Sequence, residues 1–158
     1  MIESQGKIQN KKRLTQVPEF NLSYQSPEEP WLGTQSPTDV DCLFEYQGKV
    51  VVFVDFKLEG KSLERGQKYT FTHIVDALQL GGYEGAYIIE ATHNTPIDQQ
   101  FYDASICVVT RLYNNKKWIE PPYVITFRQM LEKIFKLHNL PLVHTDVLRD
   151  ELFRKFFS

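Results

Sequence analysis

Two apolar runs near the middle of the chain predict a β-hairpin. Residues 42–46 are followed by Gln47-Gly48-Lys49, and a second run extends from Val50 to Phe56. Glycine readily supplies the positive φ that tight turns require, so the two runs are expected to pair as antiparallel strands. The second run is apolar at consecutive positions, which is typical of a strand covered on both faces. We therefore predict that it is the central strand of a sheet.

Residues 63–80 follow a helical period instead. One stripe of side chains is spaced four, three and four residues apart, and Gly81-Gly82 follows, as is typical of a helix C-terminus. The stripe consists of Gln67, Phe71, Ile74 and Leu78. We expect this stripe to pack on the sheet.

The remaining pattern predicts two more strands and two more helices. Short β-rich runs occupy residues 85–91 and 105–113, an amphipathic helix is expected at 126–138, and a short last helix at about 145–157. This order predicts an α/β layer architecture in which the strand after the first helix pairs in parallel with the central strand. Ligands of such sheets bind where the strands end.

Composition places the chain among globular proteins. Its 158 residues, 42% of them hydrophobic, suffice for one domain with a sizeable core. Residues 1–38 are rich in proline and polar side chains, which predicts a mostly irregular arm packed on a domain formed by residues 39–158. No apolar run approaches the ~20 residues of a membrane span, and the polar start lacks the apolar stretch of a signal peptide. A cytoplasmic protein without a membrane partner is expected.

The charge, the cysteines and the histidines restrict which kinds of functional site fit the chain. The net charge of −2 gives no indication of a nucleic-acid partner, although binding nucleic acid needs only a local basic surface. Cys42 and Cys107 are too few for a disulfide framework or a four-cysteine metal site, and both are interpreted as buried thiols. The four histidines lack metal-ligand spacing, which favours surface or capping roles. Trp31, Trp118 and Tyr123 either stack on bases or, as we favour, pack against the domain.

The central strand ends in a pair of charged residues. Asp55 and Lys57 are two positions apart, so both side chains project from the same face at the end of the strand. Asp41 lies at the start of the preceding strand, and the hairpin brings it beside Asp55. Two converging carboxylates are costly unless a cation neutralises them, and hard oxygen ligands suit Mg²⁺ or Mn²⁺. We therefore predict a metal site held by Asp41 and Asp55, to which the backbone carbonyl of Phe56 could add a ligand.

Such a group suits the hydrolysis of phosphodiesters. That reaction needs a metal that polarises the phosphate, a water placed in line, and positive charge facing the developing negative charge. Asp41 and Asp55 would hold the metal. The ammonium group of Lys57 would orient the water or stabilise the transition state.

Four segments in chain order together resemble a known nuclease superfamily. They are Ser36-Pro37-Thr38-Asp39-Val40-Asp41, Val54-Asp55-Phe56-Lys57 and Leu63-Glu64-Arg65-Gly66-Gln67-Lys68, followed by Gly85-Ala86-Tyr87-Ile88-Ile89. The first two resemble the PD-(D/E)xK, or restriction-endonuclease-like, superfamily. The third resembles the glutamine-bearing helix of its RecB-like, VRR-NUC-like and resolvase-like branches, and the fourth resembles the strand that follows that helix.

The resemblance implies both a fold and an activity. The fold would be a restriction-endonuclease-like core, with a mixed central sheet of about four strands flanked by helices. The activity would be cleavage of DNA dependent on Mg²⁺ or Mn²⁺, with catalytic residues Asp41, Asp55, Lys57 and Gln67. In the family, the glutamine contacts the metal-site water or the DNA.

Two features depart from the pattern of the superfamily. Pro37 is separated from Asp39 by Thr38, so Asp39 and Asp41 compete for the ligand role. Asp41 is preferred because its spacing to Asp55 fits the hairpin, and Asp39 is a further candidate on the same face. Many members also carry a glutamate on a helix before the first strand. The candidates here stand in the proline-rich arm and are Glu19, Glu28 and Glu29.

Three functions stay open on the sequence alone. The favoured one is a metal-dependent deoxyribonuclease of phage or mobile-element type, phage-encoded in a bacterial host, for which a homodimer would supply a second active site. A nuclease fold that has lost activity would instead bind DNA or a protein partner. A non-nuclease interaction protein, such as a phage-encoded inhibitor, would keep Asp41, Asp55 and Lys57 apart and expose an apolar patch. In a purely structural reading, Asp55 and Lys57 form an ion pair and Asp41 caps a turn.

Overall fold

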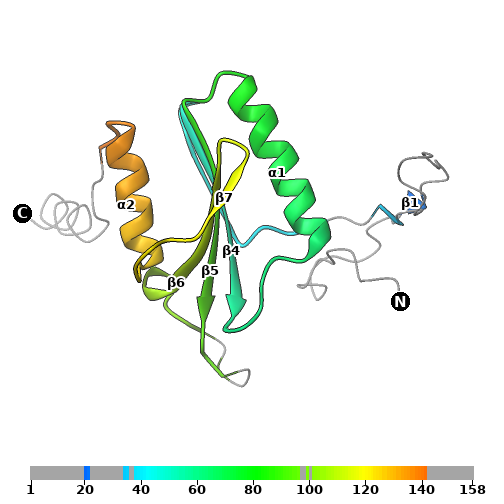
Figure 1. Ribbon diagram of the computed structural model, residues 1–158, viewed down its shortest axis with the longest axis vertical. Helices are drawn as coiled ribbons and strands as arrows, with labels where there is room; N and C mark the ends of the chain where they lie inside the picture. Colours follow the sequence, from blue (N-terminus) through cyan, green and yellow to red (C-terminus); the bar gives the residue numbers. More distant parts are fainter. Residues whose placement is uncertain (1–19, 22–33, 36–37, 97–98, 100, 142–158) are drawn as a thin grey trace, which may run out of the picture.

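The computed structural model describes residues 20–21, 34–35, 38–96, 99 and 101–141 (Figure 1). The predicted helix at about 145–157 lies outside these residues, as do Glu19, Glu28, Glu29 and Trp31. In chain order the elements are β1 (Phe20–Asn21), β2 (Thr34–Gln35), β3 (Cys42–Tyr46), β4 (Val50–Leu58), α1 (Arg65–Leu80), β5 (Gly85–His93), η1 (Ala104–Ile106), β6 (Val108–Asn114), β7 (Lys117–Ile119) and α2 (Phe127–Leu137).

Five of these strands form one mixed sheet in the order β3-β4-β5-β6-β7. β3 and β4 form the predicted antiparallel hairpin, and Gly48 in its turn has a φ of 69°. β4 and β5 pair in parallel, as the position of α1 between them predicts. About four strands were expected, and the sequence pattern did not predict β7, a three-residue strand that returns from β6 through a turn with positive φ at Asn115 and Lys116. The α/β class is confirmed.

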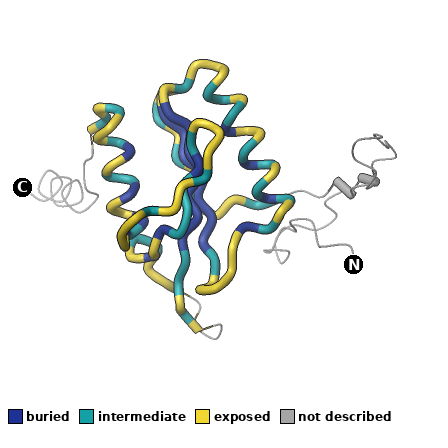
Figure 2. Tube along the Cα trace, viewed as in Figure 1, coloured by how far each residue is buried: buried dark blue, intermediate teal, exposed yellow. Residues whose placement is uncertain are grey.

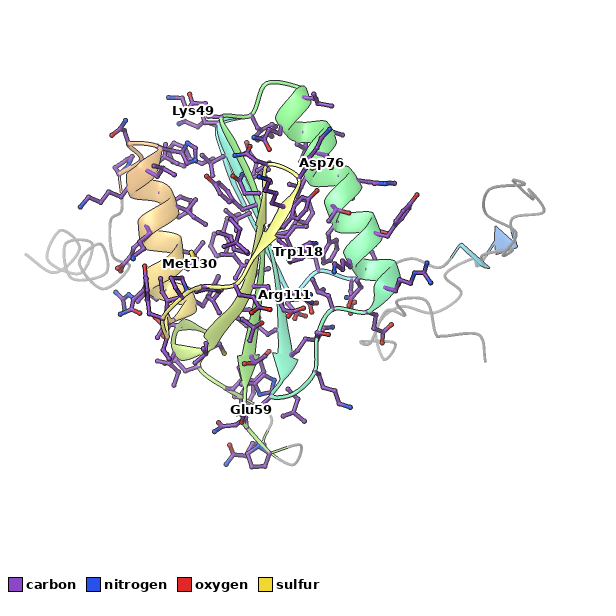
Figure 3. The ribbon with its side chains drawn as sticks, viewed as in Figure 1. Lys49, Glu59, Asp76, Arg111, Trp118 and Met130 are labelled. Atoms are coloured by element: carbon purple, nitrogen blue, oxygen red, sulfur yellow. The ribbon has the colours of Figure 1, made fainter. Side chains whose placement is uncertain are left out.

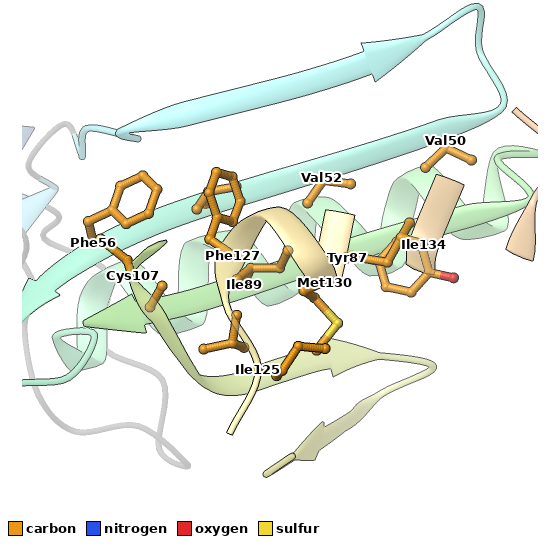
Figure 4. Close-up of a cluster of buried hydrophobic side chains, with 13 residues drawn as sticks. Val50, Val52, Phe56, Tyr87, Ile89, Cys107, Ile125, Phe127, Met130 and Ile134 are labelled. Atoms are coloured by element: carbon orange, nitrogen blue, oxygen red, sulfur yellow. The ribbon is translucent and has the colours of Figure 1, made fainter. Parts of the chain in front are cut away.

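The two helices lie on opposite sides of this sheet (Figure 1). β4 is buried from Val50 to Phe56, and burial is concentrated in the strands between the helices (Figure 2). Val50, Val52, Val54 and Phe56 contribute to the core cluster that includes Met130 and Ile134 of α2, shown in Figure 4. The alternate residues of β4 belong to a second cluster with Phe71 and Val75 of α1. A strand covered on both faces needs apolar side chains at consecutive positions, and this requirement explains the run that marked β4 in the sequence.

α1 buries a slightly different stripe from the predicted one. Gln67, Phe71 and Val75 are buried, whereas Ile74 is 40% exposed, so its predicted place in the packed stripe is wrong. Steps of four residues follow one ridge of a helix, and α1 packs on the sheet along that ridge. The inward position of Gln67 is confirmed.

α2 begins with a capping box at Thr126. The Thr126 side chain accepts a hydrogen bond from the Gln129 N–H, and the Gln129 side chain accepts one from the Thr126 N–H. This capping box satisfies two N–H groups that have no partner within the helix. Neither helix in the described part of the chain is long and apolar enough to cross a membrane.

The burial of α1 leads to a matched pair of substitutions. Val75→Ala should lower the free energy of unfolding by about 2 kcal/mol, because it truncates a side chain that is 0% exposed and leaves a cavity in the core. Ile74→Ala removes more atoms but from a half-exposed position, and should cost well under about 1 kcal/mol. Urea unfolding of both variants measures the difference. An equal or larger cost for Ile74→Ala would contradict the packing of α1 described above.

Candidate functional site

The charged residues predicted for the site lie at the C-terminal end of β4. Asp55 is 2% exposed, although it carries a carboxylate, and the side chain of Lys57 is largely buried. Both point toward the face covered by α1, because the alternate positions Val51 and Phe53 pack in the cluster beneath that helix. The predicted same-face arrangement therefore places the pair between the sheet and α1.

Gln67, in the first turn of α1, links the two charged groups. Its side-chain carbonyl accepts a hydrogen bond from Lys57 Nζ at 3.0 Å, and its amide nitrogen donates to Asp55 Oδ1 at 3.3 Å. Lys57 Nζ lies 2.8 Å from Asp55 Oδ2, which closes a triangle of three side chains. We call this group the Asp55–Lys57–Gln67 cluster. Three of the four predicted catalytic residues are thus in direct contact.

Asp41, the fourth, approaches from the end of the neighbouring strand. Its Oδ2 accepts a hydrogen bond from the Phe56 N–H at 2.7 Å. Because β3 begins at Cys42, opposite Val54, this carboxylate takes the place that a further strand residue would have in the ladder. The N–H and C=O of one strand residue point toward the same neighbouring strand, so the Phe56 carbonyl faces the side on which Asp41 lies.

Asp39 also reaches the cluster. Gln67 Nε2 lies 3.5 Å from both the backbone carbonyl and Oδ1 of Asp39, at the long limit of hydrogen bonding. Both Asp39 and Asp41 are close enough to Asp55 to raise its pKa, Asp41 more than Asp39. The stronger effect of Asp41 on Asp55 agrees with the choice of Asp41 as the preferred ligand, and Asp39 lies at the edge of the site.

Burial is the main cause that raises the pKa of Asp55. Desolvation outweighs the hydrogen bond and the positive charge of Lys57, and Asp41 and Asp39 add to it, so the pKa rises from 3.8 to about 6. Asp55 Oδ2 is buried and, apart from the ion pair with Lys57, has no aligned hydrogen bond. At neutral pH, the negative charge of the ionised Asp55 is therefore not fully compensated by the positive charge around it.

A second buried carboxylate beside Asp55 was missed by sequence reasoning. Glu90 is 2% exposed and stands directly opposite Asp55 in the parallel pairing of β4 with β5. The sequence contained a signal, because Val54-Asp55 and Ile89-Glu90 both place an acid after an apolar run. Only the register between the two strands shows that the acids are neighbours.

Glu90 is fully partnered, unlike Asp55. Arg111 donates from Nη2 to Oε2 at 2.8 Å and from Nε to Oε1 at 3.1 Å, a bidentate ion pair. Oε2 also accepts from the Leu63 N–H, and Oε1 from the Thr110 hydroxyl. Burial acts to raise the pKa of Glu90, but these hydrogen bonds together lower it. Glu90 thereby fixes the chain just before α1 to the sheet.

A bulge in β6 allows this arrangement. The β5–β6 register shifts between Glu90 and Ala91, so that Glu90 faces Arg111 while Ala91 faces Val109. The residue left over is Thr110, whose hydroxyl donates to both the backbone carbonyl and Oε1 of Glu90. The bulge therefore gives Glu90 donors from two consecutive residues.

No family model, curated protein or solved structure matches the chain. The resemblance to the PD-(D/E)xK superfamily thus stays a prediction, and the general α/β class is what the structure supports.

The donor set near Asp55 suits a hard cation that keeps most of its own water. No group of three or more histidine, cysteine, aspartate and glutamate side chains in the described part of the chain is arranged to hold a metal ion. Mg²⁺, however, commonly uses only one or two protein carboxylates, with water and substrate phosphate as the other ligands. Asp55 and Asp41, with the Phe56 carbonyl, fit that mode.

The cysteines, Trp118 and His138, which the sequence raised as candidates for other roles, make mainly structural contacts. Cys107 is buried as predicted, but Cys42 is only partly buried. Trp118 packs against Tyr113 and has Lys68 and Arg111 over its ring. It lies, with Arg111, between β7 and α1 (Figure 3), so packing within the domain is what the structure shows for it. His138 follows the end of α2, as a capping role predicts, and its Nε2 lies 2.8 Å from the Tyr87 hydroxyl.

The contrast between the two acids predicts opposite effects of isosteric substitution. Asp55→Asn removes an ionised form that burial disfavours, so at neutral pH it should raise the free energy of unfolding by about 1 to 3 kcal/mol. Glu90→Gln leaves Arg111 without its counter-charge and should lower it by about 3 kcal/mol. Urea unfolding of both variants decides. A simple structural ion pair between Asp55 and Lys57 would make Asp55→Asn destabilising as well.

The effect of Asp55→Asn should depend on pH. Because the pKa of Asp55 is higher in the folded than in the unfolded chain, its contribution to stability is present below about pH 4 and is lost as pH rises through about 6. The gain from Asp55→Asn should therefore be near zero at low pH and reach its maximum above pH ~6. A gain that is independent of pH would contradict this cause.

Metal titration tests the ligand assignment. Calorimetric titration with Mn²⁺ should show binding to the wild type, and at least a roughly tenfold weakening by either Asp41→Asn or Asp55→Asn. Asp39→Asn serves as the matched control and should weaken binding less. If Asp39→Asn has the larger effect, the assignment of Asp41 and Asp39 is reversed.

Proposed function

We propose that this protein is a metal-dependent nuclease that hydrolyses DNA phosphodiester bonds. The observation that carries the proposal is the Asp55–Lys57–Gln67 cluster, buried at the end of the central strand with Asp41 beside it. Strand ends of α/β sheets are where such proteins bind ligands. An acid, a base and an amide gathered there in direct contact are a candidate for chemistry as well as binding.

Electrostatics favour a functional over a structural role for Asp55. In a structural ion pair, the lysine normally lowers the pKa of its carboxylate partner. Here burial raises the pKa of Asp55 to about 6, although Lys57 lies 2.8 Å away. A fold gains nothing from such a group, whereas a bound cation would neutralise it. Perturbed carboxylates of this kind are concentrated at functional sites.

Each residue of the site has a part in the proposed reaction. A bound Mg²⁺ or Mn²⁺, held by Asp41 and Asp55, would polarise the phosphate and activate water. Lys57 presents positive charge to the phosphate oxygens as negative charge develops. Gln67 keeps both groups in place, because an amide can accept from the ammonium and donate to the carboxylate at once.

The alternative of an inactive nuclease fold also has an observation in its favour. The carboxylate of Asp41 already accepts the Phe56 N–H, and Asp55 is already paired with Lys57. A protein that needs these contacts only to close the end of the sheet would bind DNA or a protein without cutting it. Metal-dependent cleavage separates the two functions.

The decisive experiment compares two lysines on linear, circular, single-stranded and branched DNA. The wild type should cleave at least one of these in Mg²⁺ or Mn²⁺ and none in EDTA. Lys57→Ala should reduce the rate at least about 100-fold, because it removes a charge that faces the transition state. Lys61→Ala changes an exposed lysine four residues along and should retain the rate of the wild type.

Two results would count against the proposal. Cleavage that survives Lys57→Ala would point to a contaminating enzyme. Absence of cleavage on every substrate in both metals, together with retained Mn²⁺ binding, would favour the inactive alternative.

A further inference from the structure

The start of α1 differs from that of α2 in how it is held. Within the residues that the structure describes, the side chain of Glu64, the residue before α1, makes no capping hydrogen bond, whereas α2 begins with a complete capping box. Residues 59–62, which lead from β4 into α1, are all exposed. Leu63 is the first buried residue after them. The position of the first turn of α1 therefore depends on how the chain is held at Leu63.

Glu90 holds the chain at Leu63 from the middle of the sheet. Its Oε2 accepts a hydrogen bond from the Leu63 N–H at 2.6 Å, four residues before Gln67. Ile88, two positions earlier in β5, packs in the cluster beneath α1, so Glu90 points to the face of the sheet that α1 covers. Asp55, its partner in the β4–β5 pairing, points to the same face. One hydrogen bond thus joins the start of α1 to the strand pair that carries the candidate site.

A second line of contacts leads from Glu90 back to α1. Arg111 donates to both oxygens of Glu90, and its guanidinium carbon lies 5.0 Å from the centroid of the Trp118 ring. Lys68 Nζ lies 5.1 Å from the same centroid. Arg111 and Trp118 occupy the space between β7 and α1 (Figure 3). Lys68 follows Gln67 in the chain, so the first turn of α1 is held at a second point.

The Asp55–Lys57–Gln67 cluster tolerates little movement of this turn. The Gln67 amide accepts from Lys57 Nζ at 3.0 Å and donates to Asp55 Oδ1 at 3.3 Å, and the second distance is already near the limit of hydrogen bonding. A displacement of α1 by about 1 Å would break the longer bond, and misplacements of that size can lower a rate about 100-fold. The geometry of the cluster therefore depends on what fixes the start of α1.

We propose that Glu90 is a positioning residue of the candidate site, which acts through the Leu63 N–H to keep Gln67 within reach of its two partners. This inference rests on the proposed nuclease function. Glu90 takes no direct part in the chemistry, because donors from Arg111, Thr110 and the backbone occupy its oxygens. It supports the site from the strand beside the one that carries Asp55.

Cleavage kinetics test this role with the full-length chain in Mg²⁺, on the DNA substrate that the wild type cleaves. Glu90→Gln should lower kcat about 10- to 100-fold and change KM little, because an amide pairs poorly with Arg111 and loosens the start of α1. Val75→Ala is the matched control, since it destabilises the same helix away from its first turn. At a temperature at which both variants are folded, it should retain the kcat of the wild type.

A double-mutant cycle shows whether Glu90 acts through Gln67. Gln67→Ala should lower kcat by a similar factor, and Glu90→Gln added to it should cost little more, because the group to be positioned is then missing. Losses in kcat that simply multiply would overturn the inference. If Glu90→Gln does not fold, Glu90→Leu combined with Arg111→Met removes both charges and leaves neither buried without its partner. The same loss of kcat is expected for this pair.

Nuclear magnetic resonance spectra of the free protein test the positioning without cleavage. The ¹H–¹⁵N signals of the Gln67 side-chain amide should shift in Glu90→Gln and stay in place in Val75→Ala. Unshifted signals in Glu90→Gln would overturn the inference. If the wild type cleaves DNA and Glu90→Gln does so equally well, the nuclease function stands and the positioning role fails. If the wild type cleaves nothing, the nuclease function fails, and the Gln67 signals alone decide whether Glu90 holds the cluster.

Discussion

The parallel pairing of β4 with β5 is the constraint on which the rest of the structure depends. The two strands pair over nine consecutive residues, from Val50 with Gly85 to Leu58 with His93. A parallel pair needs a crossover connection and cover on both faces, and α1 and α2 meet these needs from opposite sides. The same register sets Asp55 beside Glu90. The position of the candidate site is therefore a consequence of how the central strands align.

The two neighbouring acids, Glu90 and Asp55, differ in how far hydrogen bonds and ion pairs compensate their charge. Glu90 has donors on both oxygens, and its charge is used to fix the start of α1 to the sheet. Asp55 has one lysine and one amide, which do not offset its burial. A carboxylate this poorly compensated weakens the fold at neutral pH, and proteins retain such groups mainly where binding or chemistry uses them.

Local features of the fold could be read from the sequence, and long-range ones could not. The hairpin, the buried central strand and the inward-facing Gln67 depend on turn chemistry and periodicity within short segments. Glu90 could not be placed beside Asp55 without the β4–β5 register, which joins residues 35 positions apart. Val75 rather than Ile74 is buried because α1 packs on the sheet along steps of four residues, a choice of ridge that depends on the sheet and not on the helix alone. β7 is too short to leave a pattern.

The bulge at Thr110 has a consequence for how the length of this chain can vary. β6 carries one residue more than β5 needs at that point, so a sequence shorter by that residue could restore a regular ladder without reversing the faces of either strand. Such a deletion would spare both cores and remove only the extra hydroxyl donor of Glu90. Elsewhere in the central strands, the loss of one residue would turn every following side chain to the wrong face. Thr110 therefore marks a position in the sheet where the loss of one residue can be absorbed, with a weaker support behind the site but without loss of the fold.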